Sequence, residues 1–144
     1  GGIATGRGML AAMILGADGV QVGSRFVTSE ESSAHPAFKE VVVNAKEGDT
    51  ELTLKELAPV RLIKNKFYQD VKELYKKSPT VDDLKALLGR ARAKKGMFEG
   101  DLEEGELEIG QIAGLIHDIK PAATILHDML KEYELAKKEV SNLF

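Results

Sequence analysis

Two glycine-rich turns near the start place the strongest constraint on the fold of this chain. The first turn covers residues 1–8, the second covers residues 19–26, and the apolar segment 9–15 lies between them. This spacing is about the length of one βα unit, so both turns can open on the same side of a parallel sheet. The pattern therefore predicts the end of an α/β domain in which two loops face one ligand.

The residue types in these turns suit a phosphate group. Where a strand ends and a helix begins, unpaired backbone N–H groups point outward with the positive end of the helix dipole behind them, and glycine allows close approach. Gly23 and Ser24 fit this role, and residues 25–32 predict the short helix that often completes such a site in a (β/α)8 barrel. An alternative remains, in which Gly16 only ends a helix and Gly1-Gly2 only form a turn.

A dinucleotide-binding fingerprint overlaps the first turn. Residues 6–11 fit the pattern G-x-G-x-x-A, and Glu30 or Glu31 follows about 20 residues later. The context argues against this hypothesis, because residues 1–5 are not an apolar strand and the second strand ends in Gly23-Ser24 instead of an acidic residue.

Composition excludes several classes of protein. At 144 residues, with 43% apolar and 30% charged residues, the chain has the balance of one soluble globular domain. The absence of cysteine excludes disulfides and suits a cytoplasmic protein, and no histidine and carboxylate set shows metal-ligand spacing. The net charge of −3 predicts no nucleic-acid partner. We expect no membrane association, since no apolar run approaches the roughly 20 residues that span a bilayer.

Only one convincing buried parallel strand is visible, over Gly19 to Val22. Parallel strands must be covered on both faces and paired along their edges. We therefore expect the chain to be the C-terminal portion of a longer polypeptide, with an N-terminal barrel portion of about six βα units missing. Taken alone, the strand invites association, and a homodimer is one arrangement that would pair it.

After His35-Pro36 the pattern becomes mainly helical. Apolar periodicity and capping residues predict helices over 36–48, 66–77, 80–95 and 109–116, a last helix opened by Pro121, and short strands over 50–54 and 59–63. The face expected for the last helix consists of Ala122, Leu126, Met129, Tyr133, Ala136 and Val140.

Gly110 and Gly114 stand out in this helical half. Glycines four residues apart clear one face of a helix, so a flat group or another helix can approach the backbone. Gln111 beside them offers a donor and an acceptor. Close helix packing in the core is the alternative interpretation.

A set of motifs extends over nearly all of the chain. It comprises Gly1-Gly2-Ile3-Ala4-x-Gly6-Arg7-Gly8, residues 15–26, Glu31-Ser32-x-Ala34-His35-Pro36, Val60-Arg61-x-Ile63-Lys64-Asn65, Gly100-Asp101 and residues 110–116. Together these resemble the C-terminal half of the nitronate monooxygenase (2-nitropropane dioxygenase) family and of its close relative, the FMN-dependent enoyl-acyl-carrier-protein reductase II. The opening motif alone is less specific, because IMP dehydrogenase and other phosphate-binding barrels carry a similar pattern.

The resemblance implies an FMN enzyme of the α/β class, in which the last βα units of a (β/α)8 TIM barrel are followed by a mainly helical lid. Residues 1–34 would end the FMN-binding barrel, residues 35–118 would form the lid region, and residues 119–144 would form a C-terminal helix that packs back on the barrel. The implied cofactor-binding residues are Gly1, Gly2, Ile3, Gly23, Ser24 and Gln111. The implied substrate pocket is lined by Glu108, Ile109 and Gly110, where relatives usually have small or apolar residues before the Gly-Gln pair.

Three functions remain open. The first is a nitronate monooxygenase that oxidises alkyl nitronates with O2, and the second is an NAD(P)H-dependent enoyl reductase that acts on an acyl thioester; in both, the protein positions the flavin. The cations Arg90, Arg92, Lys94 and Lys95 would dock an acidic carrier protein in the second case. The third is a non-catalytic helical interaction module.

The three histidines are not expected to be catalytic. His35 precedes a proline and is interpreted as a turn or cap residue, and His117 and His127 form no dyad with the adjacent aspartates because helical neighbours point to different faces. In the family, the catalytic histidine lies on an earlier strand, so it is expected upstream of this chain, and the chain alone is expected to be inactive.

Overall fold

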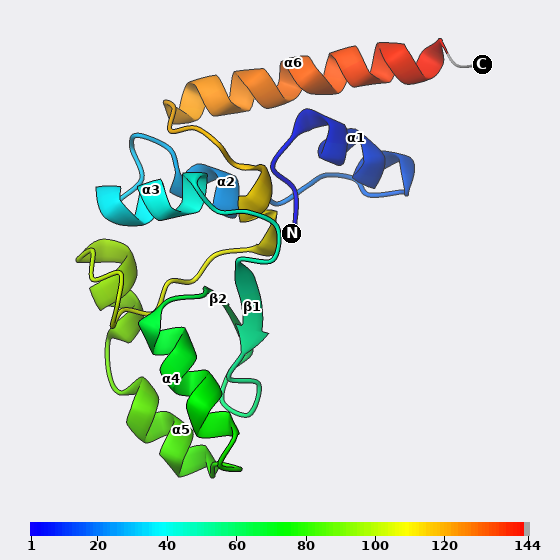
Figure 1. Cartoon of the computed structure of the whole chain (residues 1–144). Coiled ribbons are helices and arrows are strands. Elements are labelled where there is room, and N and C mark those ends of the chain that lie inside the picture. The colour runs from blue at the N-terminus through cyan, green and yellow to red at the C-terminus, as the bar shows by residue number, and fades with distance from the viewer. Residues whose placement is uncertain (143–144) are drawn as a thin grey trace.

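The computed structural model describes residues 1–142 and arranges them in layers (Figure 1). A long C-terminal helix crosses the top over the N-terminal helix, short helices fill the middle, and a β-hairpin with two helices forms the lower part. Residues 143 and 144, at the end of the predicted region 119–144, lie outside the described residues. Within residues 1–142, no helix is long and apolar enough to cross a membrane.

The top layer is the pair α1 (Gly6–Ile14) and α6 (Ala122–Ser141). Thr5 caps α1 by accepting a hydrogen bond from the Gly8 N–H at 3.0 Å, so the first glycine turn ends before Gly6. A Cβ on Gly6 would lie 2.1 Å from the Met129 carbonyl oxygen, so the absent side chain is what lets the two helices approach. The predicted turn over residues 1–8 is therefore wrong in its second half.

The buried face of α6 agrees with the prediction except at one position. Met129 and Ala136 of the predicted face are buried, whereas Leu126 is 52% exposed and its neighbour Ile125 is buried instead. Two adjacent apolar residues leave the choice between them to tertiary contacts, which the sequence pattern does not show.

The middle layer contains α2 (Ser24–Val27), α3 (Pro36–Val43) and the 3-10 helix η2 (Gln111–Leu115). Pro36 occupies the first turn of α3, and the Nδ1 of His35 accepts from the Ala37 N–H at 3.2 Å, which agrees with a cap role for His35. The core shared by these elements consists of Ala4, Phe38, Val42, Ala45, Ile63, Leu107, Ile109, Ala113 and Ile116.

The lower part is the antiparallel hairpin β1 (Thr50–Thr53) and β2 (Val60–Ile63), packed with α4 (Lys66–Tyr75) and α5 (Val81–Leu88). Both strands and both helix starts match the sequence prediction, and Thr80 with Asp83 forms a capping box. Their core consists of Leu54, Leu62, Phe67, Val71 and Leu84.

Two predicted helices are shorter than expected. Gly89, with φ of +65°, ends α5 at Leu88, and a π-helical turn, η1 (Lys94–Phe98), follows. The 109–116 helix is only the 3-10 turn η2, and in a 3-10 turn residues three apart share a face, so Gly110 and Gly114 do not line one helical face.

The predicted parallel strand over residues 19–22 does not form. The described strands are β1 and β2, and residues 19–22 have no assigned secondary structure. A parallel strand needs a neighbour on at least one side to satisfy its backbone groups, and no strand among residues 1–142 pairs with this segment.

Candidate functional site

The glycines of the predicted cofactor site leave open space beside the backbone. A Cβ placed on Gly1, Gly2 or Gly23 would meet no atom within 4 Å, and Gly2 has a φ of +77°, which favours glycine. A bulky anionic group can therefore approach these positions closely.

Ser24 joins the predicted cofactor site to the predicted substrate pocket. Its Oγ accepts a hydrogen bond from the Gly110 N–H at 3.0 Å, across 86 residues of sequence. Residues from the second glycine turn and from the Gly-Gln segment are thus in direct contact.

A cavity of about 440 Å³ contains both sets of residues. Gly23 and Ser24 line it together with Glu108, Ile109 and Gly110. The structure therefore brings together two of the predicted phosphate residues and all three predicted substrate-pocket residues.

Arg61 lines the same cavity and was not singled out from the sequence as a site residue. Its Nη1 donates to the carbonyl oxygen and the hydroxyl of Thr50, both at 3.2 Å, which fixes the guanidinium to β1. The planar guanidinium of arginine is well suited to bind phosphate. Arg61 belongs to the Val60 to Asn65 motif, and this was the sequence feature that could have identified it as a site residue.

A second cavity, of about 530 Å³, contains the other pair of predicted cofactor residues. Gly2 and Gln111 line it together with Glu47, Gly48, Ile112, Gly114 and Leu115. Gly1 and Ile3 line neither of these two cavities. Gly1 is exposed, and Ile3 is half-buried near Gly8.

The segment that carries Glu108 is held as an extra strand beside β2. The Ile63 N–H donates to the Leu107 carbonyl at 3.0 Å, and the Ile109 N–H donates to the Arg61 carbonyl at 3.1 Å. This pairing fixes one side of Glu108 and directs Gly110 toward Ser24.

Asn65 secures the loop that precedes this segment. Its Nδ2 donates to the carbonyl oxygens of Leu102 and Gly105, each at 2.8 Å, and its Oδ1 accepts from the Tyr68 N–H at 3.0 Å. One side chain therefore caps α4 and holds the loop in place, which explains the asparagine at the end of the Val60 to Asn65 motif.

A buried carboxyl group lies close to the substrate-pocket segment. Glu106 is only 7% exposed, and burial, followed by the negative charge of Glu108, raises its pKa to about 7, although Arg92 acts in the opposite direction. Glu106 is thus a titratable group near neutral pH, two residues from the cavity lining.

The residues after the second turn are fixed by two buried cations. Arg25, 9% exposed, donates to Thr28 Oγ1 at 2.8 Å and to the Asp118 carbonyl at 3.2 Å, and it pairs with the Asp118 carboxylate. Burial acts to raise the pKa of Asp118, but Lys120 and Arg25 hold that pKa below its usual value. Lys39, 6% exposed, donates to the carbonyl oxygens of Ser29, Glu30 and Ser32.

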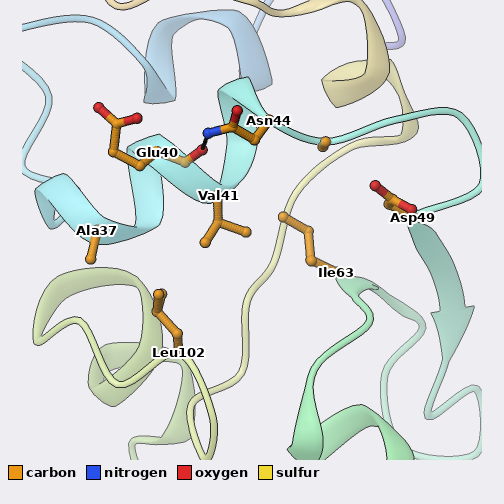
Figure 2. A pocket seen from close by; sticks show the side chains of 8 residues that line it. Ala37, Glu40, Val41, Asn44, Asp49, Ile63 and Leu102 are labelled. Carbon is orange, nitrogen blue, oxygen red and sulfur yellow. Dashed lines mark hydrogen bonds between the residues drawn. The ribbon is translucent and has the colours of Figure 1, made fainter.

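A third cavity, of about 470 Å³, contains none of the predicted site residues. Figure 2 shows Val41, Ile63 and Leu102 around this space between α3 and β2, with Glu40 and Asp49 at its edges. Its lining is mostly apolar and gathers no set of catalytic groups, so it is not the candidate site. Within residues 1–142, no group of three or more histidine, cysteine, aspartate or glutamate residues is arranged to hold a metal ion.

Comparison with known proteins shows the family of this chain. A family model described as nitronate monooxygenase matches residues 1–132. A probable nitronate monooxygenase from Staphylococcus saprophyticus is 35% identical over 126 residues, which cover 87% of this chain and 35% of that protein.

Two solved structures share the fold. FabK from Thermotoga maritima is 39% identical with a TM-score of 0.89, covering 100% of this chain and 46% of that one. Nitroalkane oxidase from Streptomyces ansochromogenes is 27% identical with a TM-score of 0.73, covering 97% of this chain and 40% of that one. The neighbours are TIM-barrel enzymes, and the chain spans less than half the length of each of these relatives.

Proposed function

Because the chain belongs to the nitronate monooxygenase family, whose members are flavin-dependent oxidoreductases, we propose that it supplies part of the FMN site of such an enzyme. In this proposal the chain is the C-terminal part of the TIM barrel together with its lid. A preceding portion of the polypeptide completes the barrel and supplies the catalytic histidine.

The residues present fit an FMN phosphate. Gly2 and Gly23 leave the backbone open where a Cβ would stand, and Ser24 and Arg61 place a hydroxyl and a guanidinium beside Gly23 in one cavity. Gly23, Ser24 and Arg61 would hold the phosphate, because a dianion favours hydrogen-bond donors and a cation. Gly2 lines the other cavity, so it would contact another part of FMN.

Gln111 would act at the other cavity, toward the ring system and the substrate. When bound, FMN supplies the electron transfer that no amino-acid side chain provides. The residues of this chain orient the cofactor and shape the substrate pocket, in which Glu108 adds a negative charge beside Ile109 and Gly110.

We favour oxidation of alkyl nitronates with O2, and the observation that carries this choice is the match of the nitronate monooxygenase model over residues 1–132. Reduction of an enoyl thioester by NAD(P)H is the second candidate, favoured by the 39% identity to FabK over the whole chain.

The cations Arg90, Arg92, Lys94 and Lys95 do not strengthen the case for the enoyl reductase. Arg92 donates to the carbonyl oxygens of Leu87, Leu88 and Glu104. Lys94 pairs with Glu99 at 3.1 Å, and Lys95 pairs with Asp101 at 2.9 Å. Three of the four cations thus have partners inside the chain, so they are less available to bind an acidic carrier protein.

The test uses the complete polypeptide that carries this chain. It is purified, its bound flavin is identified, and it is offered either a nitronate with O2 or NADPH with crotonyl thioester while flavin absorbance is followed. Inertness toward nitronate with turnover of the thioester would exclude the first function in favour of the second. A polypeptide without flavin that folds as a colourless monomer would exclude both and support the helical interaction module.

A further inference from the structure

We propose that the Ser24 hydroxyl couples the phosphate of the cofactor to the position of the Gly110-Gln111 segment. The inference rests on the proposed function, since it requires FMN phosphate at the second glycine turn. In this role Ser24 is a positioning residue as well as a phosphate ligand.

The first observation is the hydrogen bond itself. The Gly110 N–H donates to Ser24 Oγ at 3.0 Å, and this contact joins two segments 86 residues apart. On one side of Gly110, residues 107–109 are paired with β2, and on the other side η2 begins at Gln111. The contact with Ser24 therefore fixes the point where the chain passes from one cavity to the other.

The second observation concerns why residue 110 is glycine. Its φ of −68° and ψ of 155° are allowed for any residue, so the backbone does not require glycine. A Cβ on Gly110 would lie 2.6 Å from Ser24 Oγ but 3.7 Å from Ser24 Cβ and 3.8 Å from Ile112 Cγ2. The Ser24 hydroxyl is thus the group that a side chain at position 110 would displace.

The chemistry of the hydroxyl explains the coupling. A serine hydroxyl that accepts the Gly110 N–H still carries one hydrogen to donate, and a phosphate oxygen is a strong acceptor. Donation to the phosphate polarises the hydroxyl and strengthens the bond it accepts. A phosphate at the turn and the observed position of Gly110 therefore stabilise each other, and this linkage is reciprocal.

The experiment compares the complete polypeptide with its Ser24→Ala, Gly110→Ala and double variants. The dissociation constants of FMN and of riboflavin, which lacks the phosphate, are measured for each protein. Exchange of the Gly110 amide hydrogen and the unfolding temperature are followed in parallel. Ser33→Ala is the matched control for Ser24→Ala, because Ser33 is exposed.

We expect Ser24→Ala to weaken FMN binding by about tenfold or more and riboflavin binding by less than about threefold, with faster exchange of the Gly110 amide. Gly110→Ala should weaken FMN binding in the wild-type background. In the Ser24→Ala background the same change should cost less than about threefold, because the 2.6 Å contact is gone.

Two results would overturn the inference while leaving the proposed function intact. One is that Gly110→Ala weakens FMN binding by the same factor in the wild-type and Ser24→Ala proteins. The other is that Ser24→Ala weakens the binding of FMN and of riboflavin by the same factor. A wild-type polypeptide that binds no FMN would instead overturn the proposed function, and the coupling to phosphate with it.

Discussion

Lys39 gives the sharpest stability prediction, because its ammonium group is buried and is held by three backbone carbonyl oxygens. It donates to the carbonyl oxygens of Ser29 at 2.6 Å, Ser32 at 2.9 Å and Glu30 at 3.2 Å. Lys39→Met removes three charge-assisted hydrogen bonds, each of which stabilises the fold by about 2 kcal/mol. Methionine also avoids about 3 kcal/mol of ammonium desolvation, so the net loss of unfolding free energy is about 3 kcal/mol. For a chain of this size, that loss lowers the unfolding temperature by roughly 6–12 °C.

The measurement is urea and thermal unfolding of Lys39→Met beside Lys77→Met, a variant of an exposed lysine after α4. The control should lie within about 0.5 kcal/mol of the wild type. If Lys39→Met unfolds at the same urea concentration as the control, the three carbonyl contacts do not stabilise the segment after the second turn and the reasoning fails.

Three more predictions concern Glu106, Asn65 and Gly6. The folded state keeps a proton on Glu106 up to a pKa of about 7, whereas the unfolded state loses it near 4.5, so its contribution to stability falls as pH rises between these values. Glu106→Gln should therefore become more stable relative to wild type by about 3 kcal/mol as the pH rises from about 4.5 to about 8 in urea unfolding. A stability difference between the two proteins that stays constant with pH would contradict this. Asn65→Ala should lower the free energy of unfolding by about 3 kcal/mol in thermal unfolding and speed amide exchange over residues 102–107. Unchanged exchange over these residues would contradict the role of Asn65 in holding the loop. Gly6→Ala should cost about 3 kcal/mol or more, because its Cβ would lie 2.1 Å from a carbonyl oxygen of α6, while Gly19→Ala should be neutral in the same melting experiment; equal melting temperatures would refute the close approach.

Features set by local chemistry could be predicted from the sequence. The cap at Thr80, the proline at the start of α3 and the alternation in β1 each depend on residues a few positions apart, and all three lie where expected. Gly2 and Gly23 also leave open space beside the backbone, and their contact with a phosphate stays a prediction.

Features set by distant contacts could not be predicted. Gly6 fits a turn motif in the sequence, but its role is contact with α6, and its N–H donates to the Glu132 carboxylate at 2.8 Å. The sequence pattern predicts a helix from residue 109, but residues 107–109 pair with β2. The hairpin offers unpaired backbone groups at this edge, and the sequence pattern does not show them. The Ser24 to Gly110 hydrogen bond likewise has no local signal.

The contact between α1 and α6 has a consequence for biosynthesis. Gly6 and its hydrogen-bond partner on α6 are 126 residues apart, so at about 5–20 residues per second roughly 6–25 s pass between their emergence from the ribosome. The lower core, by contrast, draws its buried residues from positions 54–84 and can assemble while translation continues. The buried face of α1 therefore stays uncovered on the nascent chain until α6 emerges, whereas the lower core can be complete before then.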